Sequence, residues 1–389
     1  MIARRLPSLA LALAFALAGT AAPARAKDVQ SAQTDREGIW IKGDLHVHSR
    51  HSEDSSNHEV SAILAFAQTV GLDFLLISDH DNHVGGAIAQ NTWADPEFHS
   101  DTIVLLYGAE WTTNRGHANP ISARPYDHQR LYDVRDARDI RIGAVKDELG
   151  IHLSANHPSN DDAFSMSYDM VDSLEVWNSV LSSRNKSALL VWDDLLKSGR
   201  MMTGRGGSDA HHGQMPNPDM ANERAREASA NNIGTPTTWV RAKARTSAAV
   251  VDALTHGQVS ISANPMAPRV EFTADLDGDG SGDMVMGDNR AAPPGAAVRF
   301  SVALVGGVSA AASYKVDVIK NGGVFQTLAL DGVHNVSFTD TPAANGRTYY
   351  RVEVRGAVPA YPQVPNAALV AGDLVALSNP LYFNFDPLF

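Results

Sequence analysis

The stretch Ile39-Trp40-Ile41-Lys42-Gly43-Asp44-Leu45-His46-Val47-His48-Ser49 shows how the rest of the chain is organised. It opens with a short apolar run and ends in two histidines separated by one residue. Residues i and i+2 of a strand point to the same side, so His46 and His48 would project together, as two ligands of one ion must. On its own, a His-x-His pair is as compatible with a structural role as with metal binding.

The same plan recurs through residues 27–264, where a short apolar run ends in polar residues and helical spacing often follows, as at 60–70 and 188–196. Continuous apolar strands that alternate with helices predict a parallel sheet covered on both faces. Six or seven such units favour a closed or nearly closed α/β barrel over an open sheet. The apolar runs are 39–41 leading to 45, 72–77, 103–106, 151–153, 171–177 and 201–203.

Metal-binding side chains follow these apolar runs, at the strand ends that converge on one face of an α/β barrel. They are too many for one ion, so we expect two or three divalent ions, each with about three or four protein ligands. Imidazole and carboxylate ligands suit Zn, Mn or Fe. In the loop after His48, Asp54 is the preferred carboxylate ligand and Glu53 is the alternative. The predicted ligands are His46, His48, Asp54, His80, Glu110, His117, His157, Asp209 and His211.

Four further side chains are candidates for catalysis. Arg205, just before Gly206-Gly207, could contact a phosphoryl oxygen, and Arg115 competes with it for this role, although either could instead form a surface salt bridge. Asp81, His83 or a metal-bound water could serve as the general acid. Asp79 could accept a hydrogen bond from a ligand imidazole and so orient it.

Composition excludes several classes of protein and site. The chain has 389 residues, 44 acidic and 32 basic side chains, a net charge of −12 and no cysteine. The proportions are globular, and the absence of cysteine excludes disulfides, Fe–S clusters and thiolate zinc sites. The negative charge argues against stable nucleic-acid binding, which needs basic side chains to neutralise phosphates. We expect a small-molecule ester as the partner, while the oligomeric state is left open.

The N-terminus has the pattern of a secretory signal peptide. Arg4 and Arg5 precede an apolar run at 6–18 that is too short to span a bilayer, and Ala24-Arg25-Ala26 offers a cleavage site. We therefore expect residues 1–26 to be removed and the protein to be exported, either to the periplasm or into the medium. No other segment is apolar enough to cross a membrane.

The composition changes after Asn264, where helical periodicity fades and short alternating runs appear. About seven or eight short strands, with a hairpin signal at Asn321-Gly322, predict an immunoglobulin-like β-sandwich over 265–389. The acidic stretch from Asp275 to Asp288 resembles an incomplete calcium loop, so it predicts either a calcium site or a solvated turn. The long polar insert at 212–232 predicts a loop that covers the substrate, or one without function.

The order of these motifs resembles the PHP (polymerase and histidinol phosphatase) superfamily of metal-dependent phosphoesterases. Several phrases are similar to its CehA/McbA-type metallohydrolases. The resemblance extends over residues 40–264. The phrases are GDLHVHS at 43–49, LLISDHDN at 75–82, GAEWTTNRGHAN at 108–119, ANHP at 155–158, LEVWN at 174–178, GGSDAH at 206–211 and IGTPTTWV at 233–240.

The resemblance implies a distorted (β/α)7 barrel with two or three metal ions. It places one ion on His46, His48, Glu110 and Asp209. It makes Glu110 a bridge to a second ion that is also held by His117 and His157. It gives a third ion to Asp54, His80 and His211. Asp54 lies one place later than the acidic residue of the commonest spacing in this superfamily, which keeps Glu53 as the alternative.

These observations predict a secreted phosphoesterase that hydrolyses a small phosphomonoester or phosphodiester with a hydroxide bridging two ions. The alternative within the same resemblance is a carbamate or carboxylic ester hydrolase that uses the same metal cluster. A non-catalytic metal-binding or adhesion protein is the alternative of another class. The complete set of metal ligands argues against this non-catalytic alternative, because binding a partner does not require an open site with several ions.

Overall fold

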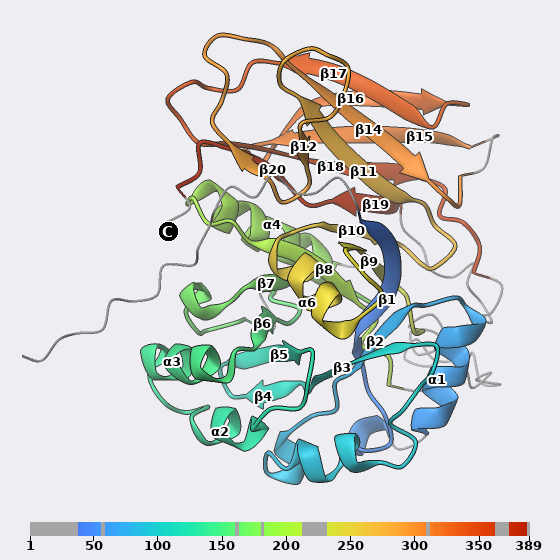
Figure 1. Ribbon diagram of the computed structural model, residues 1–389, viewed down its shortest axis with the longest axis vertical. Coiled ribbons are helices and arrows are strands. Elements are labelled where there is room, and N and C mark those ends of the chain that lie inside the picture. Colours follow the sequence, from blue (N-terminus) through green and yellow to red (C-terminus); the bar gives the residue numbers. More distant parts are fainter. Residues whose placement is uncertain are drawn as a thin grey trace, which may run out of the picture.

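The structure is a computed structural model that describes residues 38–55, 59–159, 163–179, 183–211, 232–308, 312–361 and 373–386. The predicted signal peptide and residues 212–231 of the insert lie outside these ranges. Figure 1 shows the alternating strands and helices of the first part below and the later strands stacked above them. Within the described ranges, no helix has both the length and the apolar character needed to cross a membrane.

The first part of the chain alternates strands with helices, as its periodicity predicts. Its strands are β1 (Ile39–Val47), β2 (Phe74–Ile77), β3 (Val104–Gly108), β4 (Trp111–Thr113), β5 (Gly116–Ser122), β6 (His152–Ala155), β7 (Ser173–Asn178), β8 (Thr203–Gly207), β9 (Thr237–Ala242) and β10 (Val259–Ser262). Its helices are α1 (Val60–Thr69), α2 (His128–Asp133), α3 (Asp139–Leu149), α4 (Ser183–Lys197) and α6 (Ser247–Thr255). Short 3-10 turns lie at Glu53–Ser55, Asn82–Val84, Ile88–Gln90, Thr92–Ala94 and Tyr168–Met170.

These strands form a mixed sheet. β1, β2 and β3 are parallel, and so are β6, β7 and β8. Between the two groups lies the β4–β5 hairpin, and β5 pairs antiparallel with both β3 and β6. β9 runs antiparallel to β1, and β10 antiparallel to β9. The prediction of a parallel sheet is therefore confirmed for β1–β3 and β6–β8, the six strands that overlap the predicted apolar runs, whereas β4, β5, β9 and β10 lie outside those runs and are antiparallel to their partners.

The segment that follows β8 returns to the end of β1. The Asp209 N–H donates to the His46 carbonyl over 2.8 Å, and the His48 N–H donates to the Ala210 carbonyl over 3.0 Å. Val47 and Ala210 also form an isolated parallel bridge. Side chains that are about 160 residues apart in the sequence are thereby brought to one place. Closure of the whole sheet as a (β/α)7 barrel stays a prediction.

The C-terminal part consists of strands. They are β11 (Arg269–Asp275), β12 (Met284–Val285), β13 (Asn289–Arg290), β14 (Val298–Val305), β15 (Ser313–Lys320), β16 (Gly323–Asp331), β17 (Asn335–Asp340), β18 (Thr348–Gly356), β19 (Leu374–Ser378) and β20 (Leu381–Phe383). β15 and β16 form the predicted hairpin, with φ of 50° at Asn321 and 79° at Gly322. Asn-Gly tolerates positive φ at both turn positions, as a tight hairpin requires.

Two sheets pack face to face here. β12, β11, β14 and β17 form a four-stranded sheet, while β15, β16, β18, β19 and β20 extend the large sheet through the pairing of β19 with β10. Phe300 on β14 packs against Phe338 on β17, with ring centroids 4.8 Å apart, and against Tyr350 on β18 of the other sheet at 4.5 Å. The contact between Phe300 and Tyr350 thus joins the inner faces of the two sheets.

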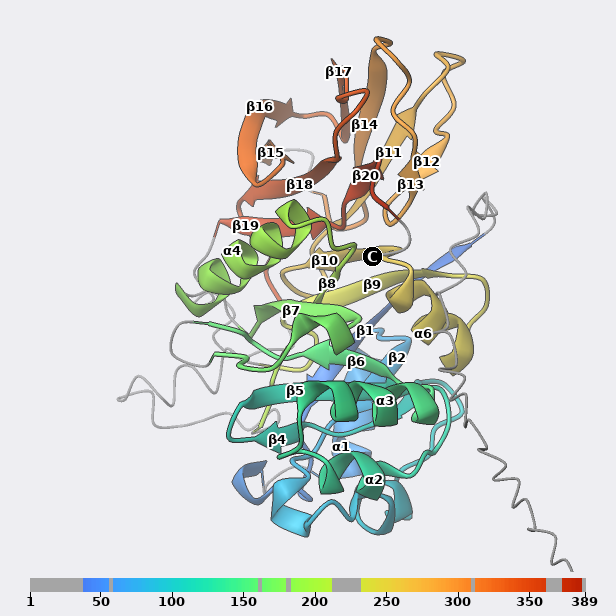
Figure 2. The same ribbon diagram turned by 90° about the vertical axis from the view of Figure 1, so that its left-hand side faces the viewer.

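The two parts of the chain share buried polar contacts. Figure 2 shows α4 directly beneath β18 and β19. Arg351 of β18 donates from Nε and Nη2 to the two carboxylate oxygens of Asp193 in α4, over 3.0 and 2.7 Å. Asn379 bonds both the N–H and the carbonyl of Gly204 in β8, over 2.7 and 2.8 Å. The C-terminal strands are therefore attached to the elements that position the site.

Candidate metal centre

The C-terminal end of β1 and the residue that follows it place two histidines side by side in the interior. His46 and His48 have no exposed surface, and their ring centroids lie 5.1 Å apart. Asp44, two residues earlier on the same strand, is also buried and accepts the N–H groups of His46, Ser208 and Gly234 over 3.1, 3.0 and 2.7 Å. Asp44 thus connects β1 to the loops on either side of the 212–231 segment.

Glu110 lies at the centre of the site, just after β3. Its Oε2 is 3.2 Å from His46 Nε2 and 3.3 Å from His48 Nε2. Its Oε1 is 3.0 Å from His117 Nδ1 and 3.1 Å from His157 Nε2. One carboxylate thus presents one oxygen to each of two pairs of imidazoles, which is the arrangement that a ligand bridging two ions requires.

Asp209 completes the first group. Its Oδ1 lies 3.3 Å from His46 Nε2 and 3.2 Å from His48 Nε2. One donor atom from each of these three residues and from Glu110 lies within 4.8 Å of all the others. Gly207 allows this close approach, because a Cβ there would lie 2.5 Å from the Cβ of His46 and 2.4 Å from Glu175 Oε1.

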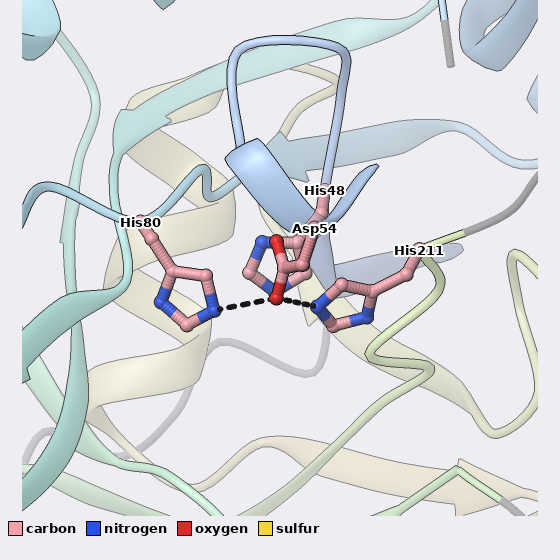
Figure 3. A group of neighbouring side chains, drawn as sticks. All are labelled: His48, Asp54, His80 and His211. Atoms are coloured by element: carbon pink, nitrogen blue, oxygen red, sulfur yellow. Dashed lines mark ion pairs between the residues drawn. The ribbon is translucent and has the colours of Figure 1, made fainter. Parts of the chain in front are cut away.

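A second group shares His48 and opens toward solvent. Figure 3 shows the Asp54 carboxylate between the rings of His80 and His211, with His48 behind it. Asp54 Oδ2 lies 3.5 Å from His80 Nε2 and 3.1 Å from His211 Nε2. One donor atom from each of the four side chains lies within 4.8 Å of the others. The carboxylate of Glu53 points instead to His83, at 3.9 Å, so the geometry favours Asp54.

The third group contains His80, Glu110 and His117, again within 4.8 Å. The Nδ1 atom of His80 is 3.3 Å from Glu110 Oε2 but 2.6 Å from the Thr112 hydroxyl. Because the Thr112 contact is much shorter, we assign His80 to the group of Asp54 and His211. His157 faces Glu110 next to His117, with ring centroids 5.5 Å apart.

Hydrogen bonds to acceptors set the tautomers of two ligand imidazoles. His46 Nδ1 faces the Glu175 carboxylate at 3.0 Å, and His211 Nδ1 faces the carbonyl of Asp209 at 2.8 Å. Carboxylate and carbonyl oxygens accept hydrogen bonds, so we assign the proton to Nδ1 in both rings. Nε2 of each ring then keeps its lone pair for an ion, as in many metal-binding histidines.

The charges of the first group are strongly coupled. Burial by itself would lower the pKa of His46, but the carboxylates of Asp209, Glu175 and Glu110 outweigh burial and raise that pKa well above its ordinary value. Burial would raise the pKa of Glu110, yet the neighbouring imidazoles, led by His46, hold it well below its usual range. The pocket therefore favours a positive charge at this point, either a proton or a metal ion.

The donor set fits a divalent cation. Nε2 of His46 and Nε2 of His48 are buried, and within the described ranges neither atom has a hydrogen-bond partner in acceptable geometry. Both point toward the same two carboxylate oxygens, of Glu110 and Asp209. Buried polar atoms are normally satisfied, and a cation coordinated by two imidazoles and two carboxylates would satisfy all four.

The structure places the other predicted catalytic residues differently. Arg205 is wholly buried and donates to Ser154, Glu175 and Asn156 over 2.7, 2.7 and 2.5 Å. This geometry favours support of Glu175 over contact with a substrate. Arg115 donates to the carboxylate of Asp139 and to the carbonyls of Ala137 and Ser165. Its guanidinium is thereby held by the loops around α3.

Asp81 and His83 also differ from each other. Asp81 is buried, and it accepts from the Thr112 N–H and faces His128 Nε2, both at 2.9 Å. A carboxylate occupied in this way is poorly placed to protonate a leaving group. His83 is partly exposed, and its Nδ1 accepts the Glu53 N–H over 3.0 Å. The proton of a neutral His83 is therefore on Nε2, and the ring centroid lies 5.4 Å from that of His80.

Several supporting residues had no assigned role in the sequence reading. Ser52 lies 3.0 Å from His48 Nδ1 and accepts the His80 N–H over 2.9 Å. Asp44 is the member of this set that strand periodicity could have revealed, because it shares a face with His46 and His48.

Asp79 does not orient an imidazole as expected. It accepts from the hydroxyls of Ser49 and Thr92, both over 2.7 Å.

The acidic loop before β12 brings Asp275, Asp277 and Asp279 within 4.8 Å of one another. Their carboxylates accept N–H groups of the loop itself, including those of Gly278 and Gly280 on Asp275. Such bonds are equally expected of a solvated turn. A calcium ion at this loop stays a prediction.

Comparisons with known proteins do not identify a family for this chain. No family model matches the chain, and no curated protein matches it. Among solved structures, it is similar to a two-domain protein containing a predicted PHP-like metal-dependent phosphoesterase from Bacteroides vulgatus. The identity is 16%, the TM-score is 0.44, and the match covers 89% of this chain and 95% of that one. An engineered protein matches at 11% identity and a TM-score of 0.18, over 82% of this chain and 80% of that one.

Proposed function

We propose that this protein is a metal-dependent hydrolase that acts on a small phosphoester. The observation that carries the proposal is the position of Glu110, whose two oxygens face separate pairs of imidazoles within one buried cluster. A purely structural carboxylate has no need of four imidazoles around it, whereas a hydrolytic centre with two ions does.

The chain offers ligands for more than one ion. His46, His48, Glu110 and Asp209 would hold one ion, and Glu110, His117 and His157 a second. Asp54, His80 and His211 would hold a third, with His48 nearby. Zn, Mn or Fe suits these ligands. Ions held there would supply Lewis acidity and a water nucleophile at neutral pH.

Other side chains keep the carboxylates in place for this chemistry. Asn156 donates to Glu110 Oε1 over 2.9 Å, and Asn178 donates to Asp209 Oδ2 over 3.3 Å. Each amide thus directs its carboxylate toward the imidazoles. Of the two candidate general acids, Asp81 is buried and already bonded, whereas His83 is partly exposed and carries its proton on Nε2, so we assign this role to His83.

The remaining features of the proposal come from the sequence. The phrases shared with PHP proteins support a phosphoester substrate, a (β/α)7 barrel and a CehA/McbA-like relationship. The spacing of the later strands supports an immunoglobulin-like sandwich over 265–389. The N-terminal pattern supports export to the periplasm or the medium. We propose no nucleic-acid partner, because the net charge is −12.

One experiment tests this function directly. The chain from Lys27 is purified, its metal content is measured, and turnover of an aryl phosphate monoester, a bis-aryl phosphodiester and a naphthyl carbamate is compared. We expect bound metal and preference for a phosphoester. Preference for the carbamate would replace the proposal with carbamate or carboxylic ester hydrolysis. A fully loaded protein without turnover would instead identify a non-catalytic metal-binding protein.

Matched variants link turnover to the cluster. D209N removes one carboxylate charge from the first group and should abolish turnover with loss of bound metal. H152Q is the control, because His152 is also a buried histidine but faces the hydroxyls of Thr255 and Ser173. Equal activity of D209N and the control would count decisively against the proposed site.

A further inference from the structure

A chain of hydrogen bonds leads away from His80 into the protein, behind the group of Asp54 and His211. It runs through Thr112, Asp81, His128 and Tyr126, and we call these four residues the His80 support chain. Asp81 and His128 are buried, with 0% and 1% of their surface exposed. None of the four is a predicted metal ligand. Their contacts show which way each hydrogen bond points.

The inner end of the support chain has one consistent arrangement of protons. The Tyr126 hydroxyl is 2.9 Å from His128 Nδ1, and His128 Nε2 is 2.9 Å from Asp81 Oδ2. The carboxylate of Asp81 can only accept, so His128 carries its proton on Nε2 and the Tyr126 hydroxyl donates to Nδ1. Burial, with a further contribution from Asp81, raises the pKa of Tyr126 well above its ordinary value, so the phenol stays protonated.

The outer end of the support chain reaches the metal centre. Asp81 Oδ1 accepts the Thr112 N–H over 2.9 Å, which holds the start of β4. The Thr112 hydroxyl donates to the Glu110 carbonyl over 3.1 Å, so it must accept from His80 Nδ1, at 2.6 Å. His80 then carries its proton on Nδ1 and keeps the lone pair of Nε2, which faces Asp54 at 3.5 Å.

Aromatic packing encloses the inner end of the support chain. The Trp93 ring packs edge-on against Tyr126, with centroids 5.1 Å apart, and against His128 at 6.5 Å. The Trp93 indole N–H also donates to the Gly108 carbonyl at the end of β3. His128 begins α2, so the orientation of His80 depends on an element that contributes no ligand itself.

We infer that Thr112, Asp81, His128 and Tyr126 are positioning residues that fix the tautomer and orientation of His80, and thereby set the affinity of the ion held with Asp54 and His211. This inference rests on the proposed metal-dependent function. Groups that hydrogen-bond a ligand imidazole in this way typically change metal affinity by about 10- to 100-fold when they are removed.

Zinc titration of the metal-free chain tests the inference by calorimetry. The titration resolves zinc sites of different affinity, which we call binding classes. The class that disappears in D54N is the one held by Asp54, His80 and His211. T112V removes the hydroxyl with little change in shape, and we expect it to weaken that class by about 10- to 100-fold while the other classes keep their affinity. T112S restores the hydroxyl and should restore the wild-type affinity.

Thr113 provides the matched control. It is next to Thr112 on the same strand, but its hydroxyl bonds the Gly116 carbonyl and the Arg115 N–H. T113V should therefore leave every zinc affinity unchanged. H128Q acts from a distance and should weaken the same class as T112V, whereas H152Q should not. Melting curves of the metal-free variants identify any that fail to fold.

The possible failures are distinct. If the wild-type chain binds no zinc, the proposed function fails and the support-chain inference fails with it. If the wild-type chain binds zinc and turns over an ester while T112V and H128Q bind with unchanged affinity, only the support-chain inference is overturned. Equal loss in T112V and T113V would show a general effect on β4 and would also overturn it.

Discussion

Arg205 Nη1 donates to Glu175 Oε1 over 2.7 Å, with both side chains wholly buried, and the same oxygen accepts from His46 Nδ1 at 3.0 Å. The arginine charge therefore offsets that of a carboxylate which orients a ligand imidazole. Burial would raise the pKa of Glu175, but Arg205 and then His46 outweigh it and lower that pKa.

Replacing Arg205 with methionine should destabilise the protein strongly. R205M leaves Glu175 buried without its cation, and breaking a buried ion pair in this way costs about 3–5 kcal/mol. Chemical denaturation of the metal-free protein measures the free energy of unfolding. R115M is the control, since Arg115 is one-third exposed. Equal unfolding midpoints for the two variants would contradict a structural role for the Arg205–Glu175 pair.

Metal ions should stabilise the folded chain. A ligand present at about 100 times its dissociation constant adds about 2.7 kcal/mol to the free energy of unfolding for each site. Chelation should therefore lower the melting temperature of the wild-type chain, and zinc should restore it. In D209N this zinc-dependent shift should be much smaller. A shift of the same size in D209N would place the stabilising ion elsewhere.

Gly207 should not tolerate a methyl group. In G207A the new Cβ would lie 2.4 Å from Glu175 Oε1 and 2.5 Å from the Cβ of His46, so His46 must move. We expect loss of the tightest bound metal, measured as metal per chain after dialysis. G346A is the control, because the nearest atom to a Cβ there is 3.6 Å away. Full metal content in G207A would show that the site can rearrange.

Asp95 provides a dependence of stability on pH that is separate from the metal centre. Its carboxylate is 2.7 Å from both Arg50 Nη2 and His51 Nε2, and it also accepts the Glu97 N–H over 2.9 Å. Burial opposes ionisation, but these hydrogen bonds outweigh it and lower the pKa of Asp95 from its ordinary 3.8 to about 2. The ionised form is therefore the one that stabilises the folded state.

This stabilisation is fully present above pH 4 and disappears as the pH falls through about 2, because the folded state then binds the proton too. We expect D95N to be about 1–2 kcal/mol less stable than the wild-type chain at pH 6, with the difference vanishing near pH 2. Denaturation of the metal-free proteins across this range measures it. D101N, at an exposed position, should show no such trend.

The positions of the ligands could be predicted from the sequence because they depend on strand periodicity. His46 lies near the end of β1 and His48 directly follows it on the same side, and Asp209 and His211 follow β8, so their convergence needed only the rule that parallel strands present their ends together. The order of the strands in the sheet could not be predicted from the sequence in the same way. The β4–β5 hairpin interrupts the parallel pattern, and its polar sequence from Thr112 to Asn119 has no alternating apolar signal.

The roles of the charged residues could not be predicted in the same way. Arginine is almost never fully buried, so the sequence predicts that Arg205 either contacts a phosphoryl oxygen or forms a surface salt bridge. Its bonds to Glu175 on the adjacent β7, Ser154 and Asn156 show that the guanidinium is satisfied inside the protein. Likewise, Asp81 and His128 are 47 residues apart, and no local pattern indicates that they meet.

The ion pair between Asp193 and Arg351 affects how the protein can be divided for experiments. A shortened chain ending near residue 264 would keep Asp193 on α4 but lose Arg351 and the Tyr349 hydroxyl that also donates to it. It would also lose Asn379, which bonds the N–H and the carbonyl of Gly204 in β8, one residue before Arg205. Such a fragment would expose a strand edge ready to aggregate, so a loss of activity on shortening would report misassembly and not the chemistry of the missing residues.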